Sequence, residues 1–176
     1  MKTIVEKVKE ALSSAIWQSA VASSQILKFQ EGVVASCKKN YCGMYGKTWM
    51  CPPGVGDLQS LKRKYTAYKN IFVFTSKHNI EDSFDIEGMS EARMLHQSYN
   101  DIAMKALDGE DFKILGAGGC SICKKCTYPT SPCAFPKKAH PSVEACGINV
   151  VELSADLGIN YVNGENTVTY FSVIFF

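Results

Sequence analysis

The chain has 176 residues, of which 46% are hydrophobic and 20% charged, a composition that suits one globular domain over residues 1–176. Its net charge of +2 indicates no strong attraction to nucleic acid, and no apolar stretch reaches the roughly 20 residues that span a membrane. Glu6 and Glu10 stand beside the N-terminal lysines, which does not fit a signal peptide. We therefore expect a cytoplasmic protein with no nucleic-acid and no membrane partner.

The first third of the chain is expected to hold one helix, two short strands and a loop. Apolar residues at helical spacing predict a helix over residues 3–24. The stretches "QILKF" and "GVVASC" then predict two short strands, or one bulged strand, that lead into Cys37. Residues 37–56 are rich in Cys, Gly and Pro, which predicts a loop. Asp57 is placed to cap a following helix that ends near Tyr68.

The middle of the chain predicts a strand and a long helix. "NIFVFTSK" is a strongly apolar strand, and the polar "HNIEDSFDIEG" after it predicts a loop. Ser90 is a suitable N-cap for a helix from Glu91 to about Leu107, with Gly109 just beyond its end. The apolar stripe expected to be buried on this helix consists of Ala92, Leu95, Tyr99, Ile102 and Ala106.

The last third predicts two more strands around a second cysteine-rich segment. "FKILGAG" is the first of these strands, and "TVTYFSVIFF", apolar on both faces, is expected at the centre of a sheet. Between them, a short helix is expected from Ser142, a turn near Gly147, and then a second helix or strand. The alternation favours an α/β fold with a small mixed sheet flanked by helices, and cysteine-rich loops 37–56 and 118–147 at strand ends.

Eight cysteines in a cytoplasmic chain favour metal binding over disulfides, because that compartment keeps thiols reduced. In the second loop, Cys120, Cys123 and Cys126 match the C-x2-C-x2-C part of the bacterial ferredoxin run, C-x2-C-x2-C-x3-C-P. Cys133 comes three residues late, and the proline that follows is Pro136. Zinc sites more often use separate C-x2-C pairs. The spacing therefore predicts a [4Fe–4S] cluster, with zinc as the alternative.

The first loop supplies three more thiols, Cys37, Cys42 and Cys51, and Cys146 stands alone downstream. Together they make a second set of four, so we expect two clusters, and at least one. If Cys146 is instead a buried core residue, one iron of the second cluster remains open to a substrate. Fourth cysteines can also serve a neighbouring cluster, so Cys133 or Cys146 can close either site.

The remaining polar residues near the thiols have two interpretations each. Lysines in the two loops either raise a cluster's reduction potential and form a docking rim for an acidic electron donor, or are solvated loop residues. They are Lys38, Lys39, Lys47, Lys124, Lys125, Lys137 and Lys138. The three histidines, His78, His96 and His140, are expected at the surface, with His140 as a stand-in metal ligand in the alternative.

Three blocks together carry a family resemblance: "CKKNYCGMYGKTWMCPP", "GGCSICKKC" and "HPSVEACGINV". Over roughly residues 25–176 the chain resembles a family of uncharacterised predicted metal-binding proteins of bacteria and archaea, a domain of unknown function frequent in anaerobes. The resemblance implies a cysteine-bound centre of the iron–sulfur kind and no established reaction. The ligands it implies are Cys37, Cys42, Cys51, Cys120, Cys123, Cys126 and Cys133, with Cys146 as a further candidate.

Three functions compete at this point. The first is an electron-transfer protein that exchanges electrons with a redox partner such as a ferredoxin or an oxidoreductase. The second is an enzyme that uses a cluster with an open iron or a small-molecule pocket beside the first loop. Its pocket residues would be Tyr45, Lys47 and Trp49, which are otherwise expected to pack against the cluster. The third is a zinc-stabilised interaction module. The sequence predicts no oligomeric state.

Overall fold

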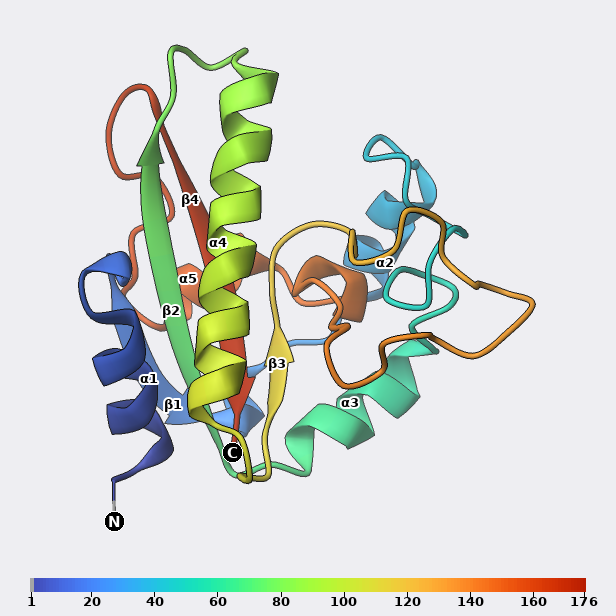
Figure 1. Ribbon diagram of the computed structural model, residues 1–176, viewed down its shortest axis with the longest axis horizontal. Helices are drawn as coiled ribbons and strands as arrows, with labels where there is room; N and C mark the ends of the chain where they lie inside the picture. The colour runs from blue at the N-terminus through green and yellow to red at the C-terminus, as the bar shows by residue number, and fades with distance from the viewer. Residues whose placement is uncertain (1) are drawn as a thin grey trace.

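The computed structural model describes residues 2–176, which form a β-sheet with helices on both faces and long loops to one side (Figure 1). The helices are α1 (Ile4–Leu12), α2 (Glu31–Lys38), α3 (Leu58–Thr66), α4 (Ile86–Ala106) and α5 (Val150–Asp156). The strands are β1 (Ser19–Ser23), β2 (Asn70–Asn79), β3 (Lys113–Leu115) and β4 (Thr167–Phe175). Short 3₁₀ turns are η1 (Ser13–Ala15), η2 (Ser24–Ile26) and η3 (Glu144–Cys146).

The sheet of the described residues has four strands in the order β1-β2-β4-β3, and each neighbouring pair is antiparallel. The predicted α/β class is confirmed, and so is the central position of β4. The sheet is antiparallel where we expected a mixed one. The reason is that β2 and β3 run in the same direction and are connected through α4, but β4 is inserted between them and opposes both.

Two hydrophobic clusters pack on the two faces of this sheet. One cluster joins α3, α5 and η3 to inward residues of β2 and β4 such as Val73 and Val173. The other joins α1 and α4 to the alternate residues, such as Phe72 and Ile174. Successive strand residues point to opposite faces, so the continuous apolar runs of β2 and β4 serve both clusters.

The N-terminal region differs from the prediction. The helix expected over residues 3–24 ends at Leu12, because Ser13 adopts a positive φ of 43° and the chain turns into the edge strand β1. A capping box between Thr3 and Glu6 fixes its start. "GVVASC" belongs to helix α2 and not to a strand. Its two valines favour strand locally, but the segment packs as a helix against η3.

Helix α4 begins earlier than expected and buries a different face. Asp85, not Ser90, caps it by accepting a hydrogen bond from the Gly88 amide at 2.8 Å. Leu95 and Ile102, expected in the buried stripe, are 47% and 43% exposed. The face that meets the sheet consists of Ala92, His96, Asn100 and Ala103. The prediction missed it because two of these residues are polar and find polar partners on the strands.

The remaining elements follow the sequence. Asp57 caps α3, β2 and β4 are buried strands, and Gly147 makes the expected turn with a φ of 79°. Strand β2 extends to Asn79, into the segment expected to be a loop. Within residues 2–176, no helix combines the length and the apolar character that crossing a membrane requires.

Candidate metal centre

The two cysteine-rich loops are docked on one another beside the sheet (Figure 1). The Trp49 indole N–H donates to the Ser131 carbonyl oxygen at 2.9 Å, and its ring meets the edge of Tyr128 with centroids 4.9 Å apart. Gly54 lies so close that a Cβ there would stand 2.8 Å from the Tyr128 ring. Loops 37–56 and 118–147 therefore form one structural unit, although about 80 residues separate them in sequence.

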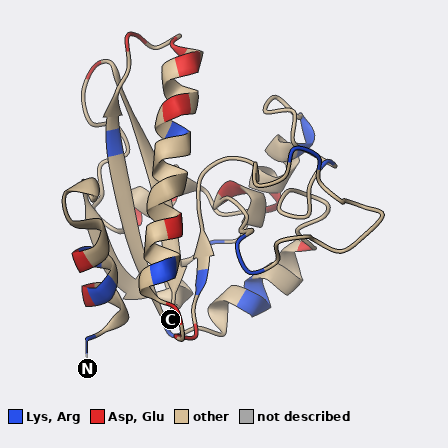
Figure 2. Ribbon diagram, viewed as in Figure 1, with Lys and Arg blue, Asp and Glu red and all other residues tan. Residues whose placement is uncertain are grey.

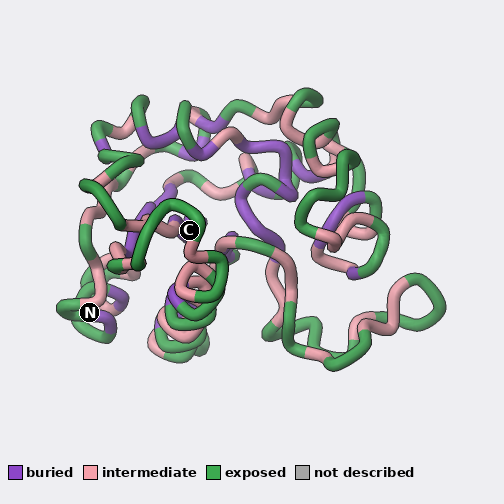
Figure 3. Tube along the Cα trace, turned by 90° about the horizontal axis from the view of Figure 1, so that it is seen from above, coloured by how far each residue is buried: buried purple, intermediate pink, exposed green. Residues whose placement is uncertain are grey.

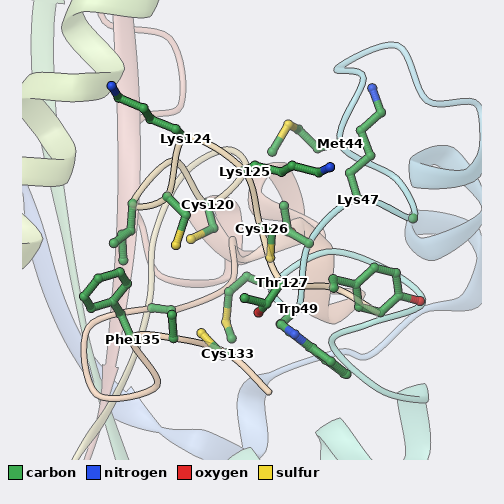
Figure 4. Close-up of a pocket in the computed structure, with 18 residues that line it drawn as sticks. Met44, Lys47, Trp49, Cys120, Lys124, Lys125, Cys126, Thr127, Cys133 and Phe135 are labelled. Atoms are coloured by element: carbon green, nitrogen blue, oxygen red, sulfur yellow. The ribbon is translucent and has the colours of Figure 1, made fainter. Parts of the chain in front are cut away.

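Four cysteines of the second loop line a cavity of about 450 Å³ between the two loops (Figure 4). The thiols are those of Cys120, Cys123, Cys126 and Cys133. The first loop contributes Met44, Lys47 and Trp49 to the same cavity. Lys47 and Trp49 thus lie where the sequence placed pocket residues, whereas Tyr45 does not line this cavity.

The environment of Cys120 shows that these thiols are electrostatic neighbours. Burial raises the pKa of the Cys120 thiol, and the Cys133, Cys123 and Cys126 thiols raise it further. The Ile122 backbone amide donates a hydrogen bond to the Cys120 sulfur and opposes this shift. Clustered thiols whose sulfurs accept backbone N–H groups are the donor chemistry of an iron–sulfur site.

A single bound ion would need several of these atoms to converge on one point. In the described part of the chain, no three His, Cys, Asp or Glu side chains converge in this way. A four-iron cluster places each ligand at a different corner, so its ligands stand further apart than those of one ion. The four thiols and the size of the cavity fit such a cluster.

The first-loop thiols do not line this cavity. Cys37 is on the last turn of α2, Cys42 is exposed, and Cys51 is buried with 7% of its surface accessible. Burial raises the pKa of Cys37, and the Cys42 and Cys51 thiols and the Glu144 carboxylate raise it further. These three thiols and Glu144 are therefore neighbours in space.

Cys51 lies where the two sets of thiols meet. Its thiol accepts a hydrogen bond from the Cys120 backbone amide, and both Cys42 and Cys126 raise its pKa. The Thr48 hydroxyl is buried and has no hydrogen-bond partner among residues 2–176. It lies beside the Cys51 thiol and lowers the pKa that burial has raised.

Cys146, whose role the sequence left open, lies in the hydrophobic core. It is fully buried in the cluster that includes Leu61, Tyr65 and Ile148. Burial raises the pKa of its thiol to about 12, and the Tyr65 hydroxyl hydrogen-bonds to the same sulfur.

The charge around the thiols is mostly positive, with Glu144 as the one carboxylate in the two cysteine loops. Residues 32–56 and 112–143 contain eight lysines and no acidic residue, so the remainder of the chain is net negative. In Figure 2 the blue segments of the loops stand apart from the red segments on α1 and α4. Lys47, Lys124 and Lys125 line the cavity itself. Figure 3 shows that the outer part of loop 118–147 is exposed or half-buried, which leaves its lysines at the surface.

The histidines are not surface residues as expected. His96 is fully buried on α4, and His78 and His140 are half-buried. They belong to one hydrogen-bonded chain that the sequence analysis missed. Its contacts are His78 Nε2 to Ser76 Oγ at 2.7 Å, Ser76 Oγ to His96 Nδ1 at 2.6 Å, His96 Nε2 to Ser172 Oγ at 2.8 Å, Ser172 Oγ to Asn100 Oδ1 at 2.5 Å and Asn100 Nδ2 to His140 Nε2 at 3.3 Å.

The direction of every hydrogen bond in this chain follows from the amide of Asn100. Its oxygen only accepts, so Ser172 donates to it and must accept from His96 Nε2. His96 Nδ1 then accepts from Ser76, which accepts from His78. At the other end, His140 Nδ1 donates to the Lys138 carbonyl at 3.1 Å. In this arrangement all donors point from His78 towards the second cysteine loop, and burial lowers the pKa of all three imidazoles.

His140 anchors that loop to α4. Its Nε2 accepts from the Asn100 and Gln97 side chains, at 3.3 Å and 3.1 Å. The lone pair that a metal would need is therefore already used, which speaks against His140 as a stand-in ligand.

One sequence signal pointed to this network. His96 and Asn100 are four residues apart, and Ser76 and Ser172 interrupt otherwise apolar strands.

Comparison with known families gives one result. A family model described as "Predicted metal-binding protein (DUF2284)" matches residues 20–176. The matched range contains both cysteine loops, all eight cysteines and the whole sheet apart from the first residue of β1. The resemblance carried by the three cysteine blocks is thereby confirmed. No curated protein and no solved structure matches the chain.

Proposed function

The chain belongs to the DUF2284 family of predicted metal-binding proteins, and we propose that it is an iron–sulfur protein that transfers electrons. The observation that carries the proposal is the cavity lined by Cys120, Cys123, Cys126 and Cys133. Three of these thiols follow the ferredoxin spacing, and backbone amides of the same loops donate to cysteine sulfurs. A [4Fe–4S] cluster bound there would supply one-electron chemistry.

The protein's own residues would set how readily that electron is accepted. The Thr48 hydroxyl and the Cys120 amide donate towards Cys51, which disperses negative charge on the sulfur. Lys47 and Lys125 line the cavity and add positive charge to its surroundings, although the Lys47 ammonium is directed away from the sulfurs (Figure 4). Trp49, Tyr128 and Phe135 add apolar surface to the cavity lining. Each of these effects acts on the potential of the centre.

The partner that this surface fits is an acidic redox protein, such as a ferredoxin or the acidic face of an oxidoreductase. Ile122 and Phe135 are exposed on the second loop, at 39% and 45% of their surface. Lysines surround them on the same loop and no carboxylate intervenes in its sequence. An exposed apolar centre with a charged rim is a common arrangement of protein interfaces, and the charge steers an oppositely charged partner.

Anaerobic purification followed by iron, sulfide and zinc analysis tests the proposal. Wild-type protein should be brown and contain iron and acid-labile sulfide in equal amounts, at about four or about eight atoms per chain. The Cys126→Ala variant should lose about four irons, whereas the matched Ser131→Ala variant in the same loop should keep them. Stoichiometric zinc without iron would overturn the proposal in favour of a zinc-stabilised interaction module.

A further inference from the structure

The first loop supplies only three thiols, and the turn that carries Cys146 also carries a carboxylate that faces them. We propose that Cys37, Cys42 and Cys51 hold a second cluster together with the carboxylate of Glu144, and that Cys146 is not a ligand. This inference rests on the proposed function, because it names the ligands of a second centre of the same kind.

The geometry of η3 separates the two candidate ligands. A 3₁₀ turn has three residues per turn, so side chains two positions apart point in different directions. Glu144 is exposed on this turn, whereas Cys146 has no accessible surface. The turn is fixed at both ends, since the Ala145 amide donates to Ser142 Oγ at 3.0 Å and Gly147 ends it in the left-handed region.

The exposed side of η3 faces the first-loop thiols. Helix α2 packs against η3, and the Gln30 amide just before α2 donates to the Gly147 carbonyl at 2.7 Å. Cys37, Cys42 and Glu144 line one open groove of about 510 Å³ on this surface. Cys51 joins them as the remaining thiol neighbour of Cys37. The carboxylate thus occupies the place where a fourth ligand is missing.

Cys146 lies on the core side of the turn, where burial raises the pKa of its thiol, and it is still near enough to Glu144 and Cys37 for both to raise that pKa further. Its side chain packs between α3, α5 and the sheet in the core cluster, and the Tyr65 hydroxyl hydrogen-bonds to its sulfur. Turning it towards the groove would expose this core and leave the Tyr65 hydroxyl buried without that partner. Glu144 is exposed on the turn, and binding iron would replace the hydrogen bond between its carboxylate and Ser142.

A carboxylate ligand would give the second centre a distinct property. Carboxylate oxygen is a harder ligand than thiolate and binds iron less tightly in a sulfur-rich site. The iron held by Glu144 would therefore exchange its ligand more readily than the irons held by cysteine. The open groove beside it, lined also by Tyr41 and Ser36, gives small molecules access to that corner.

Iron content and electron paramagnetic resonance of full-length variants test this assignment. Cys146→Ala replaces the cysteine with a smaller side chain and Cys146→Val with a larger one. Each folded variant should keep the wild-type iron content of about eight atoms. Glu144→Gln should lose iron, or convert part of the second cluster to a three-iron form with its own resonance signal. Glu165→Gln, an exposed carboxylate elsewhere, is the matched control and should behave as the wild type.

Other results would overturn the assignment. Loss of about four irons in both folded Cys146 variants, with full iron in Glu144→Gln, would make Cys146 the ligand. About four irons in the wild type, unchanged by Cys37→Ala, would mean that no second centre exists, while the electron-transfer proposal stands. A wild-type protein without iron would instead refute the proposed function itself.

Discussion

The most unusual single residue is His96, an imidazole with no accessible surface between α4 and the sheet. Both its nitrogens are hydrogen-bonded to serine hydroxyls, Ser76 and Ser172. Burial lowers its pKa to about 3, against about 6.5 in an unfolded chain. The folded protein therefore keeps this residue neutral at a pH where the unfolded chain already binds a proton.

This difference predicts a pH dependence of stability. The contribution of neutral His96 is fully present above pH 6.5 and is lost as the pH falls from there towards 3, because only the unfolded state gains a proton. The free energy of unfolding should decrease by about 1.4 kcal/mol for each pH unit in this window. Denaturant unfolding of the wild type and His96→Gln between pH 7 and 4.5 measures it. The variant should show the flatter profile, and parallel profiles would contradict this account of His96.

Among the elements, α4 carries the most information about how the site is positioned. Its polar face connects the strands to the second cysteine loop through Asn100 and His140. Gly116, just after β3, permits this contact, because a Cβ there would stand 2.6 Å from Asn100 Nδ2 and 2.9 Å from His140 Nε2. The sheet and the loop are thus joined at a point where only glycine fits.

Gly116→Ala should therefore destabilise the protein by about 1–3 kcal/mol, the usual cost of overpacking a tight site. Gly32→Ala is a matched control, since a Cβ at Gly32 meets nothing within 4 Å and the position lies in helix α2. For Gly32→Ala we expect the free energy of unfolding to increase by about 0.5–1 kcal/mol, because alanine favours the helical conformation more than glycine does. Chemical denaturation followed by circular dichroism compares the two. A neutral Gly116→Ala would show that the Asn100–His140 contact adapts without cost.

The same helix shows what the sequence could and could not predict. The existence of α4, α3 and the central strands follows from the spacing of apolar residues and from the capping residues. The buried face of α4 could not be predicted, because hydrophobicity favours Leu95 and Ile102 over His96 and Asn100. The polar residues are buried only because Ser76 and Ser172 meet them from strands distant in sequence. Helix α2 was missed for a similar reason, since its contact with η3 outweighs the strand preference of its valines.

For the candidate site, spacing predicts which cysteines are ligands but says nothing of their surroundings. The C-x2-C-x2-C run predicts a cluster from local geometry alone. The position of Cys146 in the core, and of Glu144 opposite Cys37, depends on how η3 meets α2. The docking of Trp49 on Tyr128 likewise joins two loops that no local pattern connects.

At the scale of the whole molecule, the charge is divided between the cysteine loops and the rest. The loops hold seven lysines and one carboxylate, Glu144, while α1 and α4 carry acidic and basic residues together (Figure 2). A partner that approaches the metal centre therefore meets positive charge first. Screening by salt weakens such steering, because the Debye length falls to about 8 Å at physiological ionic strength.

Charge reversal on this face should weaken binding of an acidic redox protein. Lys124→Glu with Lys125→Glu should reduce the association rate with an acidic ferredoxin by about tenfold or more at low salt, and less at high salt. Lys62→Glu on the exposed face of α3 is the control and should have little effect. Stopped-flow electron transfer or titration calorimetry measures the change. Equal effects of the two variants would show that the loop lysines have no special role in docking.

The central claim is that the cysteine loops hold iron–sulfur clusters, and electron paramagnetic resonance of the anaerobically reduced protein tests it most directly. We predict a low-temperature resonance signal of a reduced [4Fe–4S] cluster. Cys123→Ala should abolish or alter the signal of the cluster that Cys120, Cys126 and Cys133 also hold. A reduced, folded protein that shows no such signal and contains zinc in place of iron would contradict the claim.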